Sequence, residues 1–413
     1  MSDHPTRALV LGLALLGAAP ANALTSYVNL NIRFLQNNGG FCPTTRNCSG
    51  SYYTQTQFGV NRPLRSVRVY LMSGATIIGQ GVTNTGGQTV IGYFWPPPDQ
   101  LNNKIVVKFE EGNGRWVVRT LTGGVNQREQ AVGMLPYAPN PGSPTLLYMT
   151  IGTPSVPDDV ANLFDVAQKG WANGLSQSSS LQSLFTGVSI RGFSDPEGTD
   201  CPTSCAFAST KIIKISMLHR FSMVPMHEMG HIANYLSHGT NSFSYGGCYD
   251  YPTECTGFPG SAGGVWYPET VEWSSASFEE GLATFAAAAG YYSSAAPVPY
   301  TCDIMAAACT TSQYDVEKMP SCPAGAYGFP INVTRYFWDL YDTTADSESV
   351  ALPLSRIYSN LGAFPEGNAN GAEDEPLVPL NQDENGRSLF DYRKYDGVTA
   401  TVWSNNCSPS PGD

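Results

Sequence analysis

One short string, H-E-x-x-H, places tight limits on how this chain folds. His227 and His231 flank Glu228 in the sequence VPMHEMGHIANYLSH. On an α-helix, residues four apart lie on one face, one turn from each other. Two imidazole nitrogens on one face can bind a single Zn²⁺ at about 2.0–2.1 Å, and the intervening glutamate then serves as general base. The string therefore predicts a helix that carries a zinc site, with Glu228 beside the metal.

The residues around the string agree with a helix. Ser222 suits the N-cap, Pro225 suits the first turn, and Gly239 suits the position that ends a helix. An apolar stripe at helical spacing is formed by Val224, Ile232, Tyr235 and Leu236. The alternative interpretation is an ordinary amphipathic helix with two surface histidines.

The N-terminus is typical of a secretory leader. Arg7 precedes the apolar run ALVLGLALLGAAP, which is too short to span a bilayer, and Ala21-Asn22-Ala23 fits a cleavage site. We expect residues 1–23 to be removed and the mature, secreted chain to begin at Leu24. No later segment has the uninterrupted apolar length of a transmembrane helix, so we expect no membrane span.

The ten cysteines all follow the leader, and an even number in an exported chain favours disulfide bonds. Connectivity cannot be derived from a sequence. Zinc binding by cysteine is the alternative, although no paired C-x-x-C is present. Local spacing favours the pairs Cys42–Cys48, Cys201–Cys205, Cys248–Cys255, Cys302–Cys309 and Cys322–Cys407.

The chain is acidic and lightly charged. Its formal net charge is −12, and charged residues make up 14%, below the roughly 25% that is usual for globular domains. Such a chain is a poor partner for nucleic acids and for anionic membranes. We therefore expect no nucleic-acid partner.

Residues 24–150 have the pattern of an all-β domain. Apolar residues alternate with period two in Val67–Leu71 and Ile105–Phe109, and Gly-rich turns lie between these segments. Trp116–Val118 suggests a further strand of the same domain. Short strands with Gly/Pro turns favour a β-sandwich. This domain could position a substrate, attach the chain to a surface or be a removable pro-segment.

Residues 151–345 mix helices and strands. A first helix can begin after Asp158 or Asp159, and Val188–Ile190 and Lys211–Met217 are typical of strands. The strings GLATFAAAAGYY and VTRYFWDLY predict helices after the H-E-x-x-H string. Residues 346–413 are rich in Gly, Asn, Asp and Pro and predict a loop-rich segment packed on the preceding domain.

Two resemblances follow from these patterns. The segment PLRSVRVYLMSGATIIGQGVTNTGGQTVIGYF resembles the transthyretin-like sandwiches that accompany many secreted peptidases. Residues 151–345 resemble the zincin peptidases, which share a mixed sheet whose edge strand lies beside an H-E-x-x-H helix. The expected fold class is α+β, with a zincin-like metallopeptidase domain preceded by an all-β sandwich.

A catalytic zinc needs three protein ligands, and the sequence offers several candidates for the third. His238 is nearest, but the metzincin pattern requires Gly at position 234 and His at position 237, where this chain has Asn234 and Ser237. Residues 239–246 resemble the aspzincin signature G-T-x-D-x-x-Y-G, but Ser242 stands in place of the aspartate ligand.

The remaining candidate is a glutamate. The string FEEGLATF resembles the E-G-x-A segment of gluzincins, notably of the aminopeptidase-N-like group. In that family the glutamate directly before the glycine binds zinc, which implies Glu280 as the third ligand. Glu280 follows His231 by 49 residues, a longer separation than is common in that group. The alternative for Glu280 is a carboxylate favoured by the dipole at a helix N-terminus. Glu279 is expected to be solvated or hydrogen-bonded to substrate.

The resemblance implies a secreted zinc peptidase that acts as a monomer on a protein or peptide substrate, with Glu228 as general base. A tyrosine is expected to stabilise the oxyanion besides the metal, and Tyr336 is the candidate that we name first. Other candidates are Tyr341, Tyr291 and Tyr292. The alternative is an extracellular binding or adhesive protein whose peptidase-like domain is inactive, although the intact H-E-x-x-H string argues against it.

Overall fold

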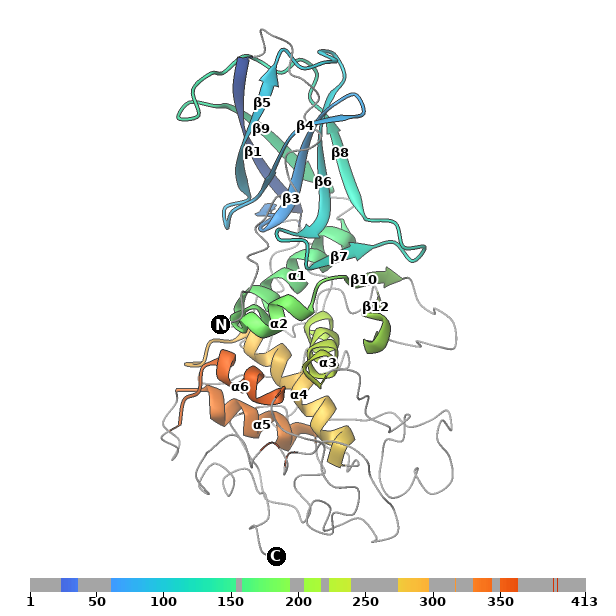
Figure 1. The fold of residues 1–413 in the computed structure, drawn as a ribbon, viewed down its shortest axis with the longest axis vertical. Coiled ribbons are helices and arrows are strands. Elements are labelled where there is room, and N and C mark those ends of the chain that lie inside the picture. Colours follow the sequence, from blue (N-terminus) through green and yellow to red (C-terminus); the bar gives the residue numbers. More distant parts are fainter. Residues whose placement is uncertain are drawn as a thin grey trace, which may run out of the picture.

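A computed structural model describes residues 24–35, 61–153, 158–193, 204–216, 223–238, 274–296, 316, 330–343, 350–362, 389 and 392. Within these ranges the chain is α+β, as expected, with two β-sheets and six α-helices. Most of the strands gather at one end of the molecule and most of the helices at the other, with β10 and β12 beside the first helices (Figure 1). The expected leader and most of the expected loop-rich tail lie outside the described residues.

The first sheet is built around β1 (Leu24–Leu35). This strand pairs antiparallel with β2 (Asn61–Pro63) and β5 (Gln88–Trp95), and parallel with β9 (Thr145–Ile151). Successive side chains of a strand point to opposite faces of the sheet. Every second residue of β1 is accordingly buried in the core, namely Val28, Leu30, Ile32 and Phe34.

The second sheet has the strand order β11-β12-β10-β7-β6-β3-β4 among the described residues, with β8 paired to β6. Its apolar side chains belong to the same core cluster as those of the first sheet. The strands are β3 (Val67–Ser73), β4 (Thr76–Val82), β6 (Asn103–Glu111), β7 (Trp116–Arg119), β8 (Gln127–Ala131), β10 (Val188–Phe193), β11 (Cys205–Phe207) and β12 (Ile212–Ser216).

Strand β7 joins the two expected domains into one sheet. We expected it to belong to the N-terminal sandwich, yet it pairs parallel with β10, and it meets β6 at the Glu110–Val117 pair. The hydrogen-bonded sheet therefore continues across residue 150. Trp116 is buried and its ring centroid lies 5.1 Å from that of Phe164, so packing on the first helix holds β7 in this position.

Four of the helices, α1, α3, α4 and α5, lie where the sequence predicts helices, whereas α2 was not predicted. Asp158 caps the first helix, since its carboxylate accepts a hydrogen bond of 3.0 Å from the backbone N–H of Ala161. The helices are α1 (Asp159–Asn173), α2 (Ser179–Leu184), α3 (Val224–His238), α4 (Ser274–Tyr291), α5 (Pro330–Tyr341) and α6 (Leu354–Leu361), with short 3₁₀ turns at Leu175–Gln177 and Ala208–Thr210.

Helix α6 lies within the tail that was expected to be rich in loops, and it was not predicted. Its apolar residues recur at the spacing of one helical face and are buried, namely Leu354, Ile357, Tyr358 and Leu361. The helix begins after Pro353, whose fixed φ angle suits the start of a helix. The surrounding segment is polar and rich in glycine, so the helical spacing of these apolar residues was not recognised in the sequence.

Two glycines allow α1 to pack closely on α4. A Cβ atom added to Gly290 would lie 2.9 Å from the Cα atom of Gly170, closer than real Cβ contacts allow. Only residues without a side chain permit this approach. Helix α1 therefore connects the sheet on one side with α4 on the other, and α4 proves to be the helix that completes the candidate site.

Of the ten cysteines, Cys205 is among the described residues; it lies on β11 and is not a free thiol. The expected five-bridge scheme involves residues outside the described set and stays a prediction.

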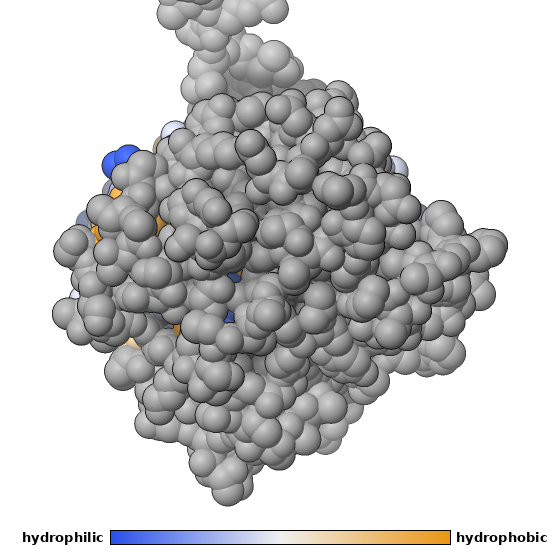
Figure 2. All heavy atoms as spheres, turned by 90° about the horizontal axis from the view of Figure 1, so that it is seen from below, coloured by the Kyte–Doolittle hydropathy of each residue, from blue (hydrophilic) through white to orange (hydrophobic). Residues whose placement is uncertain are grey.

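No helix in the described part of the chain is long and apolar enough to cross a bilayer. Seen from the helical end, described residues are visible in few places, one of them a small hydrophilic patch near the centre (Figure 2).

Candidate metal centre

Helix α3 presents the two histidines of the H-E-x-x-H string on one face. It begins at Val224, with Pro225 in the first turn, and it ends at His238, directly before the expected stop at Gly239. The backbone N–H of His227 donates to the carbonyl of Met223 at 3.0 Å, which closes the first turn. The opposite faces of α3 are buried in the core, so the histidine rings have a fixed support.

A glycine inside the string brings α4 against α3. A Cβ atom on Gly230 would lie 2.7 Å from the Cα atom and 3.1 Å from the carbonyl oxygen of Ala283. These are backbone atoms of α4, so the two helices approach as closely as their backbones permit. Glu280 lies one helical turn before Ala283 and is carried to the histidines by this contact.

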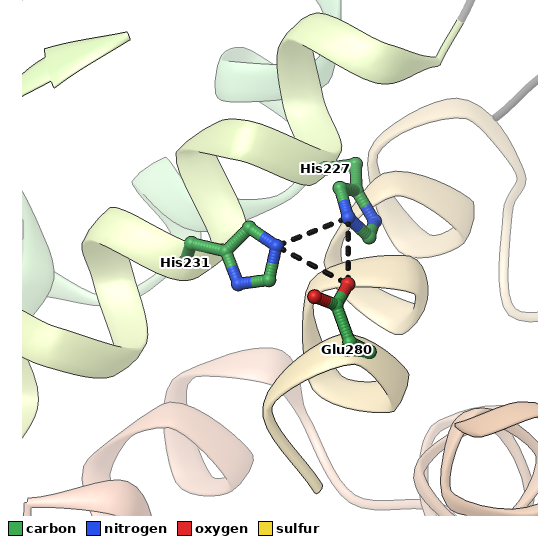
Figure 3. A group of neighbouring side chains, drawn as sticks. All are labelled: His227, His231 and Glu280. Atoms are coloured by element: carbon green, nitrogen blue, oxygen red, sulfur yellow. Dashed lines mark hydrogen bonds and ion pairs between the residues drawn. The ribbon is translucent and has the colours of Figure 1, made fainter. Parts of the chain in front are cut away.

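The side chains of His227, His231 and Glu280 point toward one another between the two helices (Figure 3). The Nε2 atoms of the histidines are 3.1 Å apart. The Oε2 atom of Glu280 lies 3.2 Å from Nε2 of His227 and 3.4 Å from Nε2 of His231. The expected third ligand, Glu280, is therefore the residue that joins the histidines.

This triangle fits a single small cation. Ligand atoms at about 2.0–2.1 Å from a tetrahedral metal ion are about 3.3–3.4 Å apart, close to the three measured separations. The Oε2 atom of Glu280 is buried and has no hydrogen-bond partner among the described residues. A buried carboxylate oxygen of this kind is costly unless a cation compensates it. The three side chains could thus hold a metal ion, and two imidazoles with one carboxylate form an ordinary donor set for zinc.

The electrostatics of the group also favour a cation. Burial raises the pKa of Glu280, but the charge of His231 and the close contacts with both histidine rings outweigh burial and lower this pKa to about 2. Burial opposes protonation of His231, but the carboxylates of Glu280 and Glu279 outweigh it and raise its pKa well above the usual value. Burial lowers the pKa of His227. The carboxylate thus attracts one positive charge, which a metal ion can supply in place of a proton.

Helix α4 also contacts the outer nitrogen of each histidine ring. The hydroxyl of Thr284 lies 3.4 Å from Nδ1 of His227, and Oε1 of Glu279 lies 3.5 Å from Nδ1 of His231. Sequence reasoning did not find Thr284, although its position one turn after Glu280 places it on the same helix face. It assigned Glu279 to solvent or substrate, whereas this side chain is only 33% exposed and contacts a ligand histidine.

Glu228 lies beside the three candidate ligands, His227, His231 and Glu280, and is not one of them. Its side chain is buried, and burial raises its pKa to about 8. The charge of His231 opposes this rise, and those of Glu279 and Glu280 add to it. The residue predicted to act as base thus has no competing ligand role.

The other candidates are distributed differently. His238 is the last residue of α3, and its side chain lies outside the described residues, as does Ser242. Tyr291 donates its hydroxyl to the carbonyl of Val166 at 2.9 Å, and a hydrogen bond with Ser294 occupies Tyr341. The side chains of Tyr336 and Tyr292 are buried in the core cluster.

No family model matches the sequence, and no curated protein matches it significantly.

Proposed function

We propose that this protein is a secreted, zinc-dependent peptidase of the gluzincin type. The observation that carries the proposal is the triangle of His227, His231 and Glu280, whose ligand atoms are 3.1–3.4 Å apart. Glu228, the general base of the H-E-x-x-H pattern, follows the first histidine directly. Both motifs that resemble gluzincins thus contribute to one site, and the order of the ligands along the chain fits that family.

Each residue has a separate task in this proposal. Zinc held by the three ligands would supply a Lewis acid for the scissile carbonyl and would lower the pKa of a water molecule toward about 7. Glu228 accepts the proton of the attacking water and returns it to the nitrogen of the leaving amine. Burial raises the pKa of the Glu228 carboxylate, which favours its protonated form and so helps it to accept the proton that it later returns.

The proposal is tested on the mature protein by metal analysis and by hydrolysis of casein. We expect one zinc per chain, loss of hydrolysis with 1,10-phenanthroline, and recovery when zinc is added back. Glu228→Gln should retain zinc and the fold and lose nearly all turnover, because base and ligand are different residues. Glu129→Gln is the matched control, since Glu129 pairs with Lys104 on an exposed part of the second sheet.

A Glu228→Gln variant that hydrolyses casein at the ordinary rate would contradict the assignment of the base. A mature protein that binds zinc and cleaves no peptide substrate would favour the alternative of an inactive peptidase-like binding protein. The two outcomes differ because the unmodified protein hydrolyses casein in the first and cleaves no peptide substrate in the second.

A further inference from the structure

We propose that Glu279 is the positioning residue for His231, and this rests on the proposed function of the site as a metal centre. The inference assigns a role to the second carboxylate of the string FEEGLATF. The two consecutive glutamates of α4 then differ in function: Glu280 would bind the metal ion, and Glu279 would orient the ring of His231.

The contacts of His231 carry this inference. Its Nε2 atom faces His227 and Glu280, at 3.1 and 3.4 Å, and is therefore the atom that would bind a metal. Its Nδ1 atom lies on the other side of the ring, is buried, and has no close hydrogen-bond partner among the described residues. The Oε1 atom of Glu279 lies 3.5 Å from this nitrogen. The carboxylate is thus within a small adjustment of a normal hydrogen bond.

A metal-bound histidine needs such a partner. The nitrogen that faces the metal must be unprotonated, so the other nitrogen carries the proton and requires an acceptor. A carboxylate in this place fixes the tautomer and the ring orientation and makes the ligand more basic. The Nδ1 atom of His227 instead lies 3.4 Å from the neutral hydroxyl of Thr284. Helix α4 therefore offers a charged partner to one histidine and an uncharged partner to the other.

The location of Glu279 supports a positioning role over simple solvation. Residues 279 and 280 are consecutive and point in directions about 100° apart on a helix. Both reach the same site because they approach opposite sides of the His231 ring. The side chain of Glu279 is 33% exposed, so its charge is available to the ring without the full cost of burial.

The test uses the full mature protein from which metal has been removed. Titration with Co²⁺ gives a visible spectrum that reports the geometry of the ligands. A separate titration with Zn²⁺, in competition with a chelating indicator, gives the metal affinity. The variants are Glu279→Ala and Glu279→Gln, and the control is Glu129→Ala, which removes a carboxylate from the β-rich end. We expect Glu279→Ala to weaken metal binding about 10- to 100-fold and to change the Co²⁺ spectrum. Glu279→Gln keeps an acceptor oxygen and should lose less.

The unfolding temperature of the metal-free protein separates positioning from a structural role. We expect only a small fall in Glu279→Ala, similar to that in the control, because a partly exposed ion pair contributes little to stability. Unchanged metal affinity with a raised KM would assign Glu279 to substrate binding and overturn the inference, as would a fall in metal-free stability with unchanged affinity. None of these readouts needs peptidase activity except KM, so failure of the peptidase proposal would be recognised separately.

Discussion

Gly230→Ala tests how the candidate site is assembled, because it changes the contact between α3 and α4 and leaves all three candidate ligands in place. The added Cβ atom would lie 2.7 Å from the Cα atom of Ala283, whereas ordinary carbon–carbon contact is about 3.5–4.0 Å. The obstructing atoms belong to the backbone of α4, so α3 and α4 must separate by roughly 1 Å at this point. Metal–ligand distances tolerate only about 0.2 Å. The substitution should therefore withdraw Glu280 from the two histidines.

The expected effects on stability and on metal binding differ in size. Overpacking costs about 1–3 kcal/mol, and replacing a helical glycine by alanine recovers about 1 kcal/mol of helix propensity. The free energy of unfolding of the metal-free protein should thus fall by no more than about 2 kcal/mol. Metal affinity should fall about 10- to 100-fold, the range that follows disturbance of the support of a metal site.

The assay compares chemical unfolding of the metal-free protein with zinc titration against a chelating indicator. Gly124→Ala is the matched control, because a Cβ atom there meets only the Thr120 hydroxyl, at 3.4 Å, and needs no rearrangement. Wild-type zinc affinity in Gly230→Ala would refute the reasoning that the helix approach places Glu280. An equal loss of affinity in both variants would do the same.

Three further outcomes are expected. Glu280→Ala and His231→Ala should each weaken zinc binding by more than the roughly 10- to 100-fold of an outer-shell residue, whereas His238→Ala should not, as measured by indicator competition. Zinc at a thousand times its Kd should add about 4 kcal/mol to the free energy of unfolding, and Glu280→Ala should abolish most of this gain in thermal unfolding. Burial, together with nearby arginines, lowers the pKa of Lys169 from 10.5 to about 8. Between pH 8 and 10.5 the Lys169 ammonium keeps its proton in the unfolded chain and loses it in the native protein. The free energy of unfolding should therefore rise with pH in this range. The rise should exceed that of Lys169→Met by at most about 3 kcal/mol.

Local patterns in the sequence were sufficient to find the three residues of the candidate metal centre. The spacing of His227 and His231 depends only on the geometry of one helix, and the glycine after Glu280 marks a close helix contact. A Cβ atom on Gly281 would lie 2.5 Å from the carbonyl oxygen of Pro330, so this glycine permits α5 to pack on α4. The resemblance of FEEGLATF to the gluzincin segment therefore coincides with a packing requirement.

Features that depend on distant partners were not accessible in this way. Strand β7 has four residues and pairs with β10, more than sixty residues later, and no local signal in Trp116–Arg119 specifies that neighbour. The contact of Glu279 with His231 likewise depends on how α3 and α4 cross. Helix α6 is a different case, because its apolar spacing is present in the sequence and was outweighed by the composition of the surrounding segment.

The arrangement of α1 bears on the open role of the N-terminal strands. Its Asp158 forms an ion pair with Arg128 of β8, and its Asp165 lies 3.6 Å from the guanidinium of Arg65, which precedes β3. On its other side, α1 packs on α4 through Gly170. The strands before residue 150 are thus connected through one helix to the element that carries Glu280. Removal of these strands would also take β7 from the sheet and make β10 a newly exposed edge strand, which can pair with another chain. We therefore expect the N-terminal region to be a permanent support of the candidate metal centre and not a removable pro-segment.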